Sequence, residues 1–447
     1  MGYPWSHSSS DKSAVLIANA RLLDGSGGPP IDRADILIEG GVFTRISAGE
    51  IEPSAGALTL DAKGKTVTPG LIDMHAHLIS GGFDTVSEKS MSYDLLDQRR
   101  ALMQMLYWGV TAVYSPVQPL KAGLELREEV RQNAFPSPRL FISGPGFTAS
   151  QGWAGSMDPA ARLEPRDAAE AADQVAELAE AGIDIIKIFY DDMDSAFCTP
   201  LPKLSKPLME AVIDQAHLSK RRVMVHVYDT DGHKDAINAG ADIMAHSAIT
   251  APVDEEYLAR ATKQKTLYLS TLCVYNDVFD ENVIREYISR DFVRRSVPEK
   301  TLNTLVSEQP LDGFEQSIKQ SNIKRLMPTI QANLRAVFHS GVPIGIGPDT
   351  GVPGAFPGLA VHREMELMAE AGIPEMALLT AATRTGAQYL DRDDLGVIEE
   401  GRVADAVIID EDPLDDIRNT RKIHTVIKDG VVVDREGLLG IIMEPAR

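Results

Sequence analysis

A repeated change from helix to strand at a glycine constrains the fold of this 447-residue chain more than any other feature. Four helical patterns end at a glycine and are followed almost at once by a hydrophobic run: Trp108-Gly109 before Val-Thr-Ala-Val-Tyr, Ala181-Gly182 before Ile-Asp-Ile-Ile-Lys-Ile, Ala239-Gly240 before Ala-Asp-Ile-Met-Ala-His, and Ser340-Gly341 before Val-Pro-Ile-Gly-Ile-Gly. Glycine is favoured where a helix ends, and a continuous apolar run is typical of a buried parallel strand. The pattern predicts parallel β/α construction over about 330 residues, which suits an eight-unit barrel with insertions.

Eight segments are candidates for the barrel strands. They lie near residues 71–77, 111–115, 139–143, 184–189, 222–228, 242–246, 267–272 and 343–349. A charged, mostly helical stretch near 275–326 separates the last two and is longer than an ordinary connection. We expect it to form a lid or an oligomer contact, and we expect the protein to be a homo-oligomer.

Both ends of the chain have a different texture, with short β-rich runs separated by Gly, Pro and Asp. Near the C-terminus, Asp429-Gly430 stands between two apolar runs and indicates a hairpin. We therefore predict an α/β protein: a (β/α)8 TIM-like barrel with a small discontinuous β-sandwich domain formed from both termini. The expected boundaries are a disordered leader at 1–12, the sandwich at 13–66 and 396–447, and the barrel at 67–395.

Charge and composition restrict the partners. The chain has 44 Lys plus Arg against 65 Asp plus Glu, a net charge of −21. Nucleic acids and anionic membranes need a concentrated positive surface, so neither is an expected partner. No stretch has the length of a membrane span, and only two cysteines are present. We predict a cytoplasmic protein that acts on a small molecule.

Residues with metal-binding side chains fall at the predicted strand ends, where barrels of this type carry their active sites. His75 and His77 close the first strand, and side chains two apart on a strand point the same way. The later strands supply Lys187, His226, His246 and Asp349. Each has a structural alternative, such as a core histidine or an aspartate that caps a turn. Their joint placement makes those alternatives improbable and predicts a metal centre.

Lys187 lies inside an apolar strand, where burial favours the neutral amine. Three roles are open on this evidence: a base, an ordinary lysine that reaches a loop, or a carbamate formed with carbon dioxide. The carbamate would supply the anionic oxygens that two cations beside histidines require.

The order Pro-Gly-Leu-Ile-Asp-Met-His-Ala-His, the strand-four lysine, His226, His246 and Gly-Pro-Asp-Thr-Gly resembles the amidohydrolase superfamily in its two-metal, carboxylated-lysine form. Towards the C-terminus, Val-His-Arg-Glu-Met-Glu-Leu, Ala-Ala-Thr-Arg-Thr-Gly-Ala and the segment around Gly-Arg-Val-Ala-Asp are similar to its imidazolonepropionase-like branch. That branch includes Xaa-Pro dipeptidases, aryl-urea hydrolases and ochratoxin-type amidases. The resemblance covers nearly the whole chain.

The resemblance implies a ligand set and a reaction. His75, His77 and Asp349 would hold one metal, His226 and His246 the other, and carboxylated Lys187 would bridge both together with a hydroxide. Zn²⁺ is the expected ion for both sites. The hydroxide would attack the scissile carbonyl, and Asp349 would carry its proton to the leaving nitrogen.

Tyr228 and two aromatic residues complete the candidate site. Tyr228 lies two residues beyond His226, so we expect its hydroxyl to support the developing oxyanion; the alternative is a tyrosine that only lines the barrel mouth. Trp153 and Phe147 are candidates for an aromatic substrate wall, with local packing as the alternative. Five further histidines lack a strand-end position and are expected to be structural or to lie at the surface: His217, His233, His339, His362 and His424.

Two departures from the family pattern bear on the substrate. The loop after the third strand, residues 143–155, lacks the histidine of dipeptidase-type relatives, which counts against dipeptide specificity. Strand eight has Gly-Pro-Asp where Gly-Thr-Asp is commoner. The sequence thus predicts a hydrolase of amide-type C–N bonds in N-acyl, peptide-like or aryl-amide compounds. The alternatives are an Xaa-Pro dipeptidase, an aryl-urea or carbamate hydrolase and, outside enzymes, a metal-free scaffold.

Overall fold

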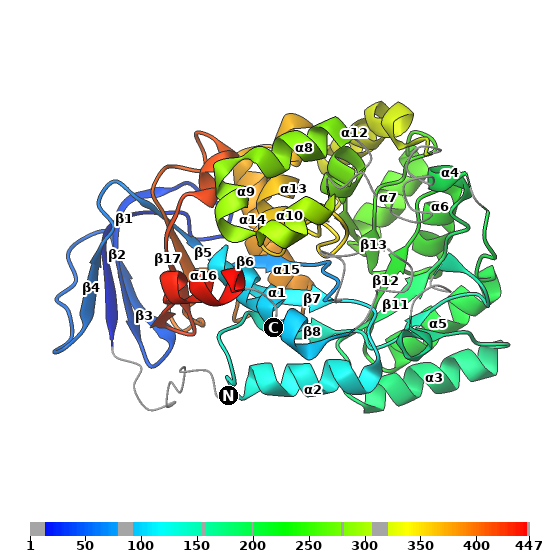
Figure 1. The fold of residues 1–447 in the computed structure, drawn as a ribbon, viewed down its shortest axis with the longest axis horizontal. Coiled ribbons are helices and arrows are strands. Elements are labelled where there is room, and N and C mark those ends of the chain that lie inside the picture. Colours follow the sequence, from blue (N-terminus) through cyan, green and yellow to red (C-terminus); the bar gives the residue numbers. More distant parts are fainter. Residues whose placement is uncertain are drawn as a thin grey trace.

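The computed structural model describes residues 14–78, 93–153, 158–198, 200–278, 281–305 and 321–444. A β-rich part at one end of the molecule adjoins a larger part in which helices surround strands (Figure 1). The predicted leader, residues 1–12, lies outside the described residues. No helix within the described ranges is long and apolar enough to cross a membrane.

The β-rich part is one eight-stranded sheet that both ends of the chain build together. Its order is β18-β17-β16-β5-β1-β2-β3, and β4 pairs with β1. The strands are β1 Val15–Leu22, β2 Ile31–Glu39, β3 Val42–Ser47, β4 Leu58–Asp61, β5 Thr66–Pro69, β16 Ala406–Ile409, β17 Ile423–Lys428 and β18 Val431–Val432. β5 joins the two ends, because it pairs with β1 on one side and with β16 on the other. The exact domain boundaries remain a prediction.

A separate hydrophobic cluster stabilises this sheet. It includes Ile17, Ile36, Phe43, Val67 and Ile408, all with at most 1% of their surface exposed. The predicted hairpin at Asp429-Gly430 is confirmed, since β17 and β18 pair antiparallel across it. Both turn residues have positive φ, 54° and 77°, as a two-residue turn between twisted strands requires.

Eight parallel strands form the barrel, and each overlaps its predicted range. They are β6 Leu71–Asp73, β7 Val110–Ser115, β8 Arg139–Ile142, β11 Ile185–Phe189, β12 Arg222–His226, β13 Ile243–Ala245, β14 Leu267–Leu269 and β15 Ile344–Gly345. They pair in the runs β6-β7-β8 and β11-β12-β13-β14-β15, with the short β9 Gly146–Phe147 and β10 Arg162–Leu163 beside β11. Backbone hydrogen bonds join the runs: Asp184 N donates to Ile142 O, and Met74 N donates to Ile346 O, both at 2.9 Å.

Alternate side chains of these strands fill the barrel interior. The interior cluster includes Ile72, Tyr114, Ile185 and Met224, and Tyr389 belongs to the same cluster. Tyr389 closes the N-terminal end of the barrel, since its hydroxyl donates to Lys265 O just before β14. The interior is therefore packed at one end, and the polar side chains gather at the other.

Helices cover the outside of the barrel. Apart from the helices that directly follow β14, those between the barrel strands are α1 Leu95–Tyr107, α2 Leu120–Arg131, α3 Ala168–Glu180, α4 Asp194–Phe197, α5 Lys206–Leu218, α6 Thr230–Ala239, α7 Glu255–Gln264 and α12 Ile323–His339. The four glycines that the sequence marks as helix ends all have φ between 79° and 99°. Gly240, for example, ends α6 in this left-handed conformation, which other residues adopt at a cost.

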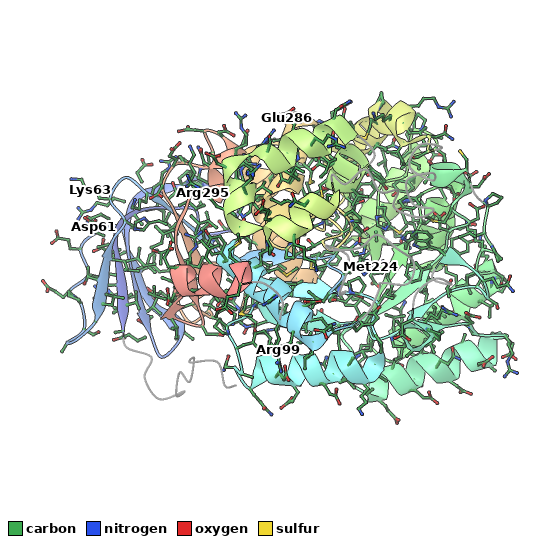
Figure 2. The ribbon with its side chains drawn as sticks, in the orientation of Figure 1. Asp61, Lys63, Arg99, Met224, Glu286 and Arg295 are labelled. Atoms are coloured by element: carbon green, nitrogen blue, oxygen red, sulfur yellow. The ribbon has the colours of Figure 1, made fainter. Side chains whose placement is uncertain are left out.

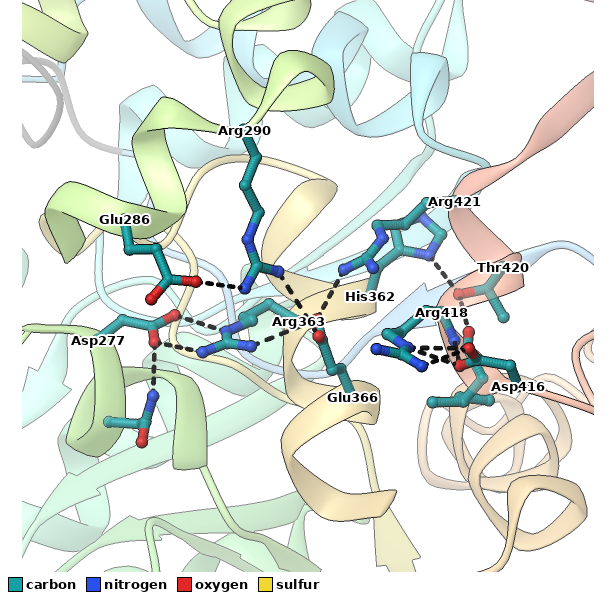
Figure 3. Close-up of polar contacts among 12 residues, drawn as sticks. Asp277, Glu286, Arg290, His362, Arg363, Glu366, Asp416, Arg418, Thr420 and Arg421 are labelled. Carbon is teal, nitrogen blue, oxygen red and sulfur yellow. Dashed lines mark hydrogen bonds and ion pairs between the residues drawn. The ribbon is translucent and has the colours of Figure 1, made fainter. Parts of the chain in front are cut away.

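The stretch between β14 and β15 begins with η3 Val274–Val278 and continues as α8 Glu281–Ser289, α9 Asp291–Ser296 and α10 Glu299–Leu305. An ion network ties it to α13 Leu359–Glu370 (Figure 3). Arg363 on α13 donates twice to Asp277, at 2.9 and 3.0 Å. Glu366 pairs with Arg363, with Arg290 after α8 and with Arg421 of η5 Ile417–Arg421. The predicted helical character is confirmed for the described residues, whereas the lid or oligomer role stays a prediction.

Four further elements follow α13: α14 Glu375–Thr380, η4 Ala381–Thr385, α15 Gly386–Tyr389 and the C-terminal α16 Arg435–Met443. The short η2 Pro159–Ala161 precedes β10.

Candidate metal centre

The first and last strands of the barrel bring His75, His77 and Asp349 together. Backbone hydrogen bonds run from Thr350 N to His75 O at 3.0 Å and from His77 N to Thr350 O at 2.6 Å. Asp349 Oδ1 consequently lies 3.3 Å from His75 Nε2 and 3.0 Å from His77 Nε2. The buried Asp73 links the same two segments, because it accepts hydrogen bonds from His75 N at 2.9 Å and from Thr350 Oγ1 at 2.8 Å.

The fifth and sixth strands supply a second pair. His226 is the last residue of β12 and His246 follows β13, and His226 Nδ1 lies 2.8 Å from His246 Nε2. The other ring nitrogen of His246, Nδ1, lies 3.0 Å from Thr271 Oγ1. His246 and Asp349 both have positive φ, 79° and 61°. Such conformations are unfavourable for residues with side chains and are concentrated at functional sites.

Lys187 lies between the two groups, on β11 (Ile185–Phe189). Its Nζ is 3.5 Å from His75 Nε2 and 3.6 Å from the sulfur of Met224, which is labelled in Figure 2. The ring centroids of His75 and His246 are 5.2 Å apart, so all six predicted ligands form one contiguous cluster. Only 1% of the Lys187 surface is exposed, and this burial lowers the pKa of its amine to about 7.

The protonation states of the other groups suit metal binding. Burial lowers the pKa values of His75, His226 and His246 well below their usual range, so each ring is neutral at pH 7 and keeps a lone pair. Burial alone would raise the pKa of Asp349, but the interactions with His77, His246 and Lys187 together outweigh it and the net shift is downward. Asp349 is therefore an anion beside the imidazole nitrogens of the cluster.

The cluster fits a divalent cation. His75, His246 and Asp349 each offer a ligand atom, and these atoms all lie within 4.8 Å of one another. Oδ1 of Asp349 is buried, and its contacts among the described residues are the Nε2 atoms of His77 and His75, at 3.0 and 3.3 Å, neither of which forms a well-directed hydrogen bond to it. A buried anionic oxygen without a donor is costly unless a positive charge compensates it. The donor set, imidazole nitrogen and carboxylate oxygen, is the one that zinc and similar ions prefer.

Tyr228 borders the histidine pair. Its ring centroid lies 4.8 Å from that of His226 and 4.9 Å from that of His246, and its backbone N donates to buried Asp191 at 2.5 Å. Burial raises the pKa of its hydroxyl well above the usual value, so the group stays protonated and can donate.

The two aromatic wall candidates differ in position. Trp153 stacks on His226 at 6.2 Å between ring centroids and 22° between ring planes, with part of its surface exposed. Phe147 has no exposed surface and packs in the large hydrophobic cluster, which favours the packing alternative for this residue.

The five histidines expected to be structural or to lie at the surface are not among the residues that form the cluster. His362 and His233 are buried and hydrogen-bonded to Trp108 O and Val227 O, respectively, whereas His217, His339 and His424 are exposed or partly exposed. Sequence reasoning missed Asp73 and Thr271, which make hydrogen-bonding contacts with the candidate ligand residues His75 and His246. Asp73 lies in the motif Pro-Gly-Leu-Ile-Asp-Met-His-Ala-His, close to both histidines, so the sequence could have indicated its supporting role.

These observations define a class of protein: an α/β barrel with a metal-binding cluster at the C-terminal ends of its strands. The model of the amidohydrolase family matches residues 66–433, and the chain belongs to the amidohydrolase family. The prediction from sequence that the chain is a member of the amidohydrolase family is thereby confirmed.

Individual relatives match short segments of the chain. Dihydroorotase of Trichlorobacter lovleyi is 46% identical over 70 residues, which is 16% of either chain. Enamidase of Eubacterium barkeri is 34% identical over 110 residues, which is 24% of this chain and 26% of the enamidase. The matched segments thus span about a sixth and a quarter of these two relatives.

Solved structures match over nearly the whole chain. An Xaa-Pro dipeptidase with bound methionine has a TM-score of 0.73 and 24% identity, with 94% of this chain and 100% of that chain covered. Molinate hydrolase has a TM-score of 0.75 and 22% identity, with 97% and 98% covered. Phenylurea hydrolase B has a TM-score of 0.71 and 18% identity, with 97% and 100% covered. At these identities the likeness establishes the shared barrel fold.

Proposed function

We propose that this enzyme hydrolyses an amide-type C–N bond of a small molecule and uses two divalent metal ions, with Zn²⁺ as the expected ion. The observation that carries the proposal is the convergence of five imidazole and carboxylate groups and one buried amine at the C-terminal ends of the barrel strands. His75, His77 and Asp349 would hold one ion, and His226 and His246 the other. When bound, two such ions lower the pKa of water towards neutrality and polarise a carbonyl group.

Lys187 would bridge the two sites as a carbamate. At pH 7 about half of its amines are neutral, because burial lowers their pKa to about 7. A neutral amine attacks carbon dioxide; a nitrogen–carbon bond forms and one proton leaves. The product carries a carboxylate at the end of the side chain, where Nζ now lies 3.5 Å from His75 Nε2.

Asp349 would then transfer the proton, and Tyr228 would stabilise the negative charge that develops on the carbonyl oxygen of the substrate. The lowered pKa of Asp349 keeps its carboxylate ionised, so it can accept a proton from the attacking water and pass it to the leaving nitrogen as the C–N bond breaks. The protonated hydroxyl of Tyr228, beside both histidines, would donate to the carbonyl oxygen as it gains negative charge.

The leading substrates are N-acyl, peptide-like and aryl-amide compounds. Trp153 stacked on His226 supports an apolar or aryl group next to the site. The names of the structural neighbours, an Xaa-Pro dipeptidase and phenylurea hydrolase B, keep dipeptides, ureas and carbamates as alternatives. A metal-free scaffold is the non-enzyme alternative, and the presence of all six ligand residues counts against it. We also propose a cytoplasmic homo-oligomer; both cysteines are free, as a reducing compartment would keep them.

A hydrolysis screen tests this function. Purified, zinc-loaded protein is incubated with dipeptides, N-acyl amino acids, anilides, aryl-ureas and carbamates, and the released amine is quantified. We expect turnover in one of these classes, lost on treatment with a chelator. Cleavage of Xaa-Pro dipeptides that depends on their free carboxylate would favour the dipeptidase. Absence of turnover throughout the panel by metal-loaded protein would favour the scaffold.

A further inference from the structure

Glu364 is a completely buried carboxylate that touches none of the six candidate ligands. It lies on α13 and has no exposed surface. Its Oε1 accepts hydrogen bonds from Ser270 Oγ at 2.5 Å and from Leu272 N at 2.9 Å, and its Oε2 accepts one from Cys273 N at 2.7 Å. All three donors belong to the turn that follows β14 (Leu267–Leu269). One side chain thus binds a turn 91 to 94 residues away in the sequence.

The residue between these donors is Thr271, whose backbone is in an unfavourable conformation. Its φ is 49°, in the left-handed region, and its β-branched side chain makes that region especially costly. The hydrogen bonds of Glu364 attach residues on both sides of Thr271, at 270 and at 272–273. They stabilise the turn against relaxation to an ordinary conformation.

The position of Thr271 matters because its Oγ1 lies 3.0 Å from His246 Nδ1. A hydrogen bond at one imidazole nitrogen sets both the orientation of the ring and the tautomer. With the Nδ1 proton donated to Thr271, Nε2 keeps its lone pair. Nε2 of His246 is the atom that faces His226, and it lies 2.8 Å from Nδ1 of His226.

We propose that Glu364 is a positioning residue for the metal centre: it holds the Ser270–Cys273 turn so that Thr271 fixes His246 for metal binding. The inference rests on the proposed function in one respect, namely that His246 is a metal ligand. It adds a path of contacts that starts at Glu364 on α13, continues through the Ser270–Cys273 turn and Thr271, and ends at His246. No ligand motif contains this path.

Glu364→Gln is the informative change, because glutamine has the same shape but a different hydrogen-bonding pattern. In either orientation its NH₂ group faces a backbone N–H, of Cys273 or of Leu272, so one of the three hydrogen bonds is replaced by two opposed donors. Glu366→Gln is the matched control. Glu366 lies two residues away on the same helix and is also buried, but its partners are Arg363, Arg421 and Arg290 (Figure 3).

The test measures the transfer of Zn²⁺ from purified, metal-loaded enzyme to a chromophoric chelator, together with thermal unfolding. We expect E364Q to bind Zn²⁺ about 10-fold more weakly than wild type, as loss of support around a ligating histidine does. T271A should show the same loss, T271S should restore much of the affinity, and E364Q/T271A should be no weaker than T271A alone. E366Q should alter thermal stability and leave Zn²⁺ affinity near that of wild type.

Wild-type Zn²⁺ affinity in E364Q, or additive losses in the double variant, would overturn the inference. Equal weakening in E364Q and E366Q would do the same, because it would show a general effect of destabilising α13. If E364Q does not fold, S270A removes one of the three bonds; unchanged Zn²⁺ retention in both S270A and T271A then overturns it. A wild-type protein that binds no Zn²⁺ would instead refute the proposed function itself.

Discussion

Replacing Lys187 with methionine should have two effects. The metal-free protein should become more stable towards unfolding, and the enzyme should lose its activity. Lys187 is buried, and the polar contacts of its amine within the described ranges are His75 Nε2 and the Met224 sulfur, at 3.5 and 3.6 Å, with the Phe189 ring centroid 5.5 Å away. Both contacts are long, so little favourable energy offsets the cost of burying a group that is charged in the unfolded chain. Methionine fills a similar volume without that cost. Activity should be lost, because the amine that would become the bridging carbamate is gone.

The magnitude follows from the pKa of the amine. Burial lowers the pKa from its ordinary value of 10.5 to about 7, and each pH unit of that difference corresponds to about 1.36 kcal/mol. Because the folded pKa is the lower one, the full cost of about 5 kcal/mol applies below pH 7 and disappears as the pH rises through 10.5. At pH 7 the cost is about 4 kcal/mol, and at pH 10 it is about 1 kcal/mol. Subtracting about 1 kcal/mol for imperfect packing leaves K187M more stable by about 3 kcal/mol at pH 7.

Urea unfolding of the metal-free proteins at pH 7 and pH 10 measures this difference. The free energy of unfolding of K187M should exceed that of wild type at pH 7, and the two should nearly coincide at pH 10. K263M, which changes an exposed lysine, is the matched control and should show no such pH-dependent gain. A K187M protein that is less stable at pH 7, or an advantage that does not change with pH, would refute the argument that Lys187 is a buried neutral amine.

Two substitutions test the roles of single side chains in the reaction. D349N should lower turnover by about 10²- to 10⁴-fold, because it removes the group that accepts the proton, and the circular dichroism spectrum should stay that of wild type. The exposed Asp393 provides its control, D393N, and similar kcat values for the two variants would contradict the assignment. Y228F should lower kcat by about 10²- to 10³-fold with little change in KM, since the hydroxyl acts only as the oxyanion develops. A decrease in kcat of less than about threefold would leave Tyr228 as a residue that merely lines the site.

The fold and the ligand cluster could be predicted because both depend on local sequence patterns. A helix that ends at glycine and runs into a buried strand is recognisable within about 20 residues, and parallel strands place their ends at one edge. Once the strands were assigned, the positions of His75, Lys187 and His226 followed from counting residues. The hairpin at Asp429-Gly430 was predictable for the same reason, since two adjacent residues determine the turn.

The residues that support the candidate ligands could not be predicted in this way. Glu364 meets the turn at residues 270–273 across more than 90 positions, and no periodicity links them. Phe147 stands in a glycine-rich segment that suggests an exposed loop, yet it pairs with β11 through β9 and is completely buried. Thr271 lies within the predicted seventh strand, but the strand ends at Leu269, and the contact with His246 depends on the turn that follows. Such contacts arise from tertiary packing and require the three-dimensional structure.

The metal content of the purified protein tests the central claim most directly. Protein grown in zinc-supplemented medium and freed of loosely bound metal should contain two metal ions per chain by inductively coupled plasma mass spectrometry. Fewer than one ion per chain in folded protein would contradict the proposal that His75, His77, Lys187, His226, His246 and Asp349 form a two-metal centre.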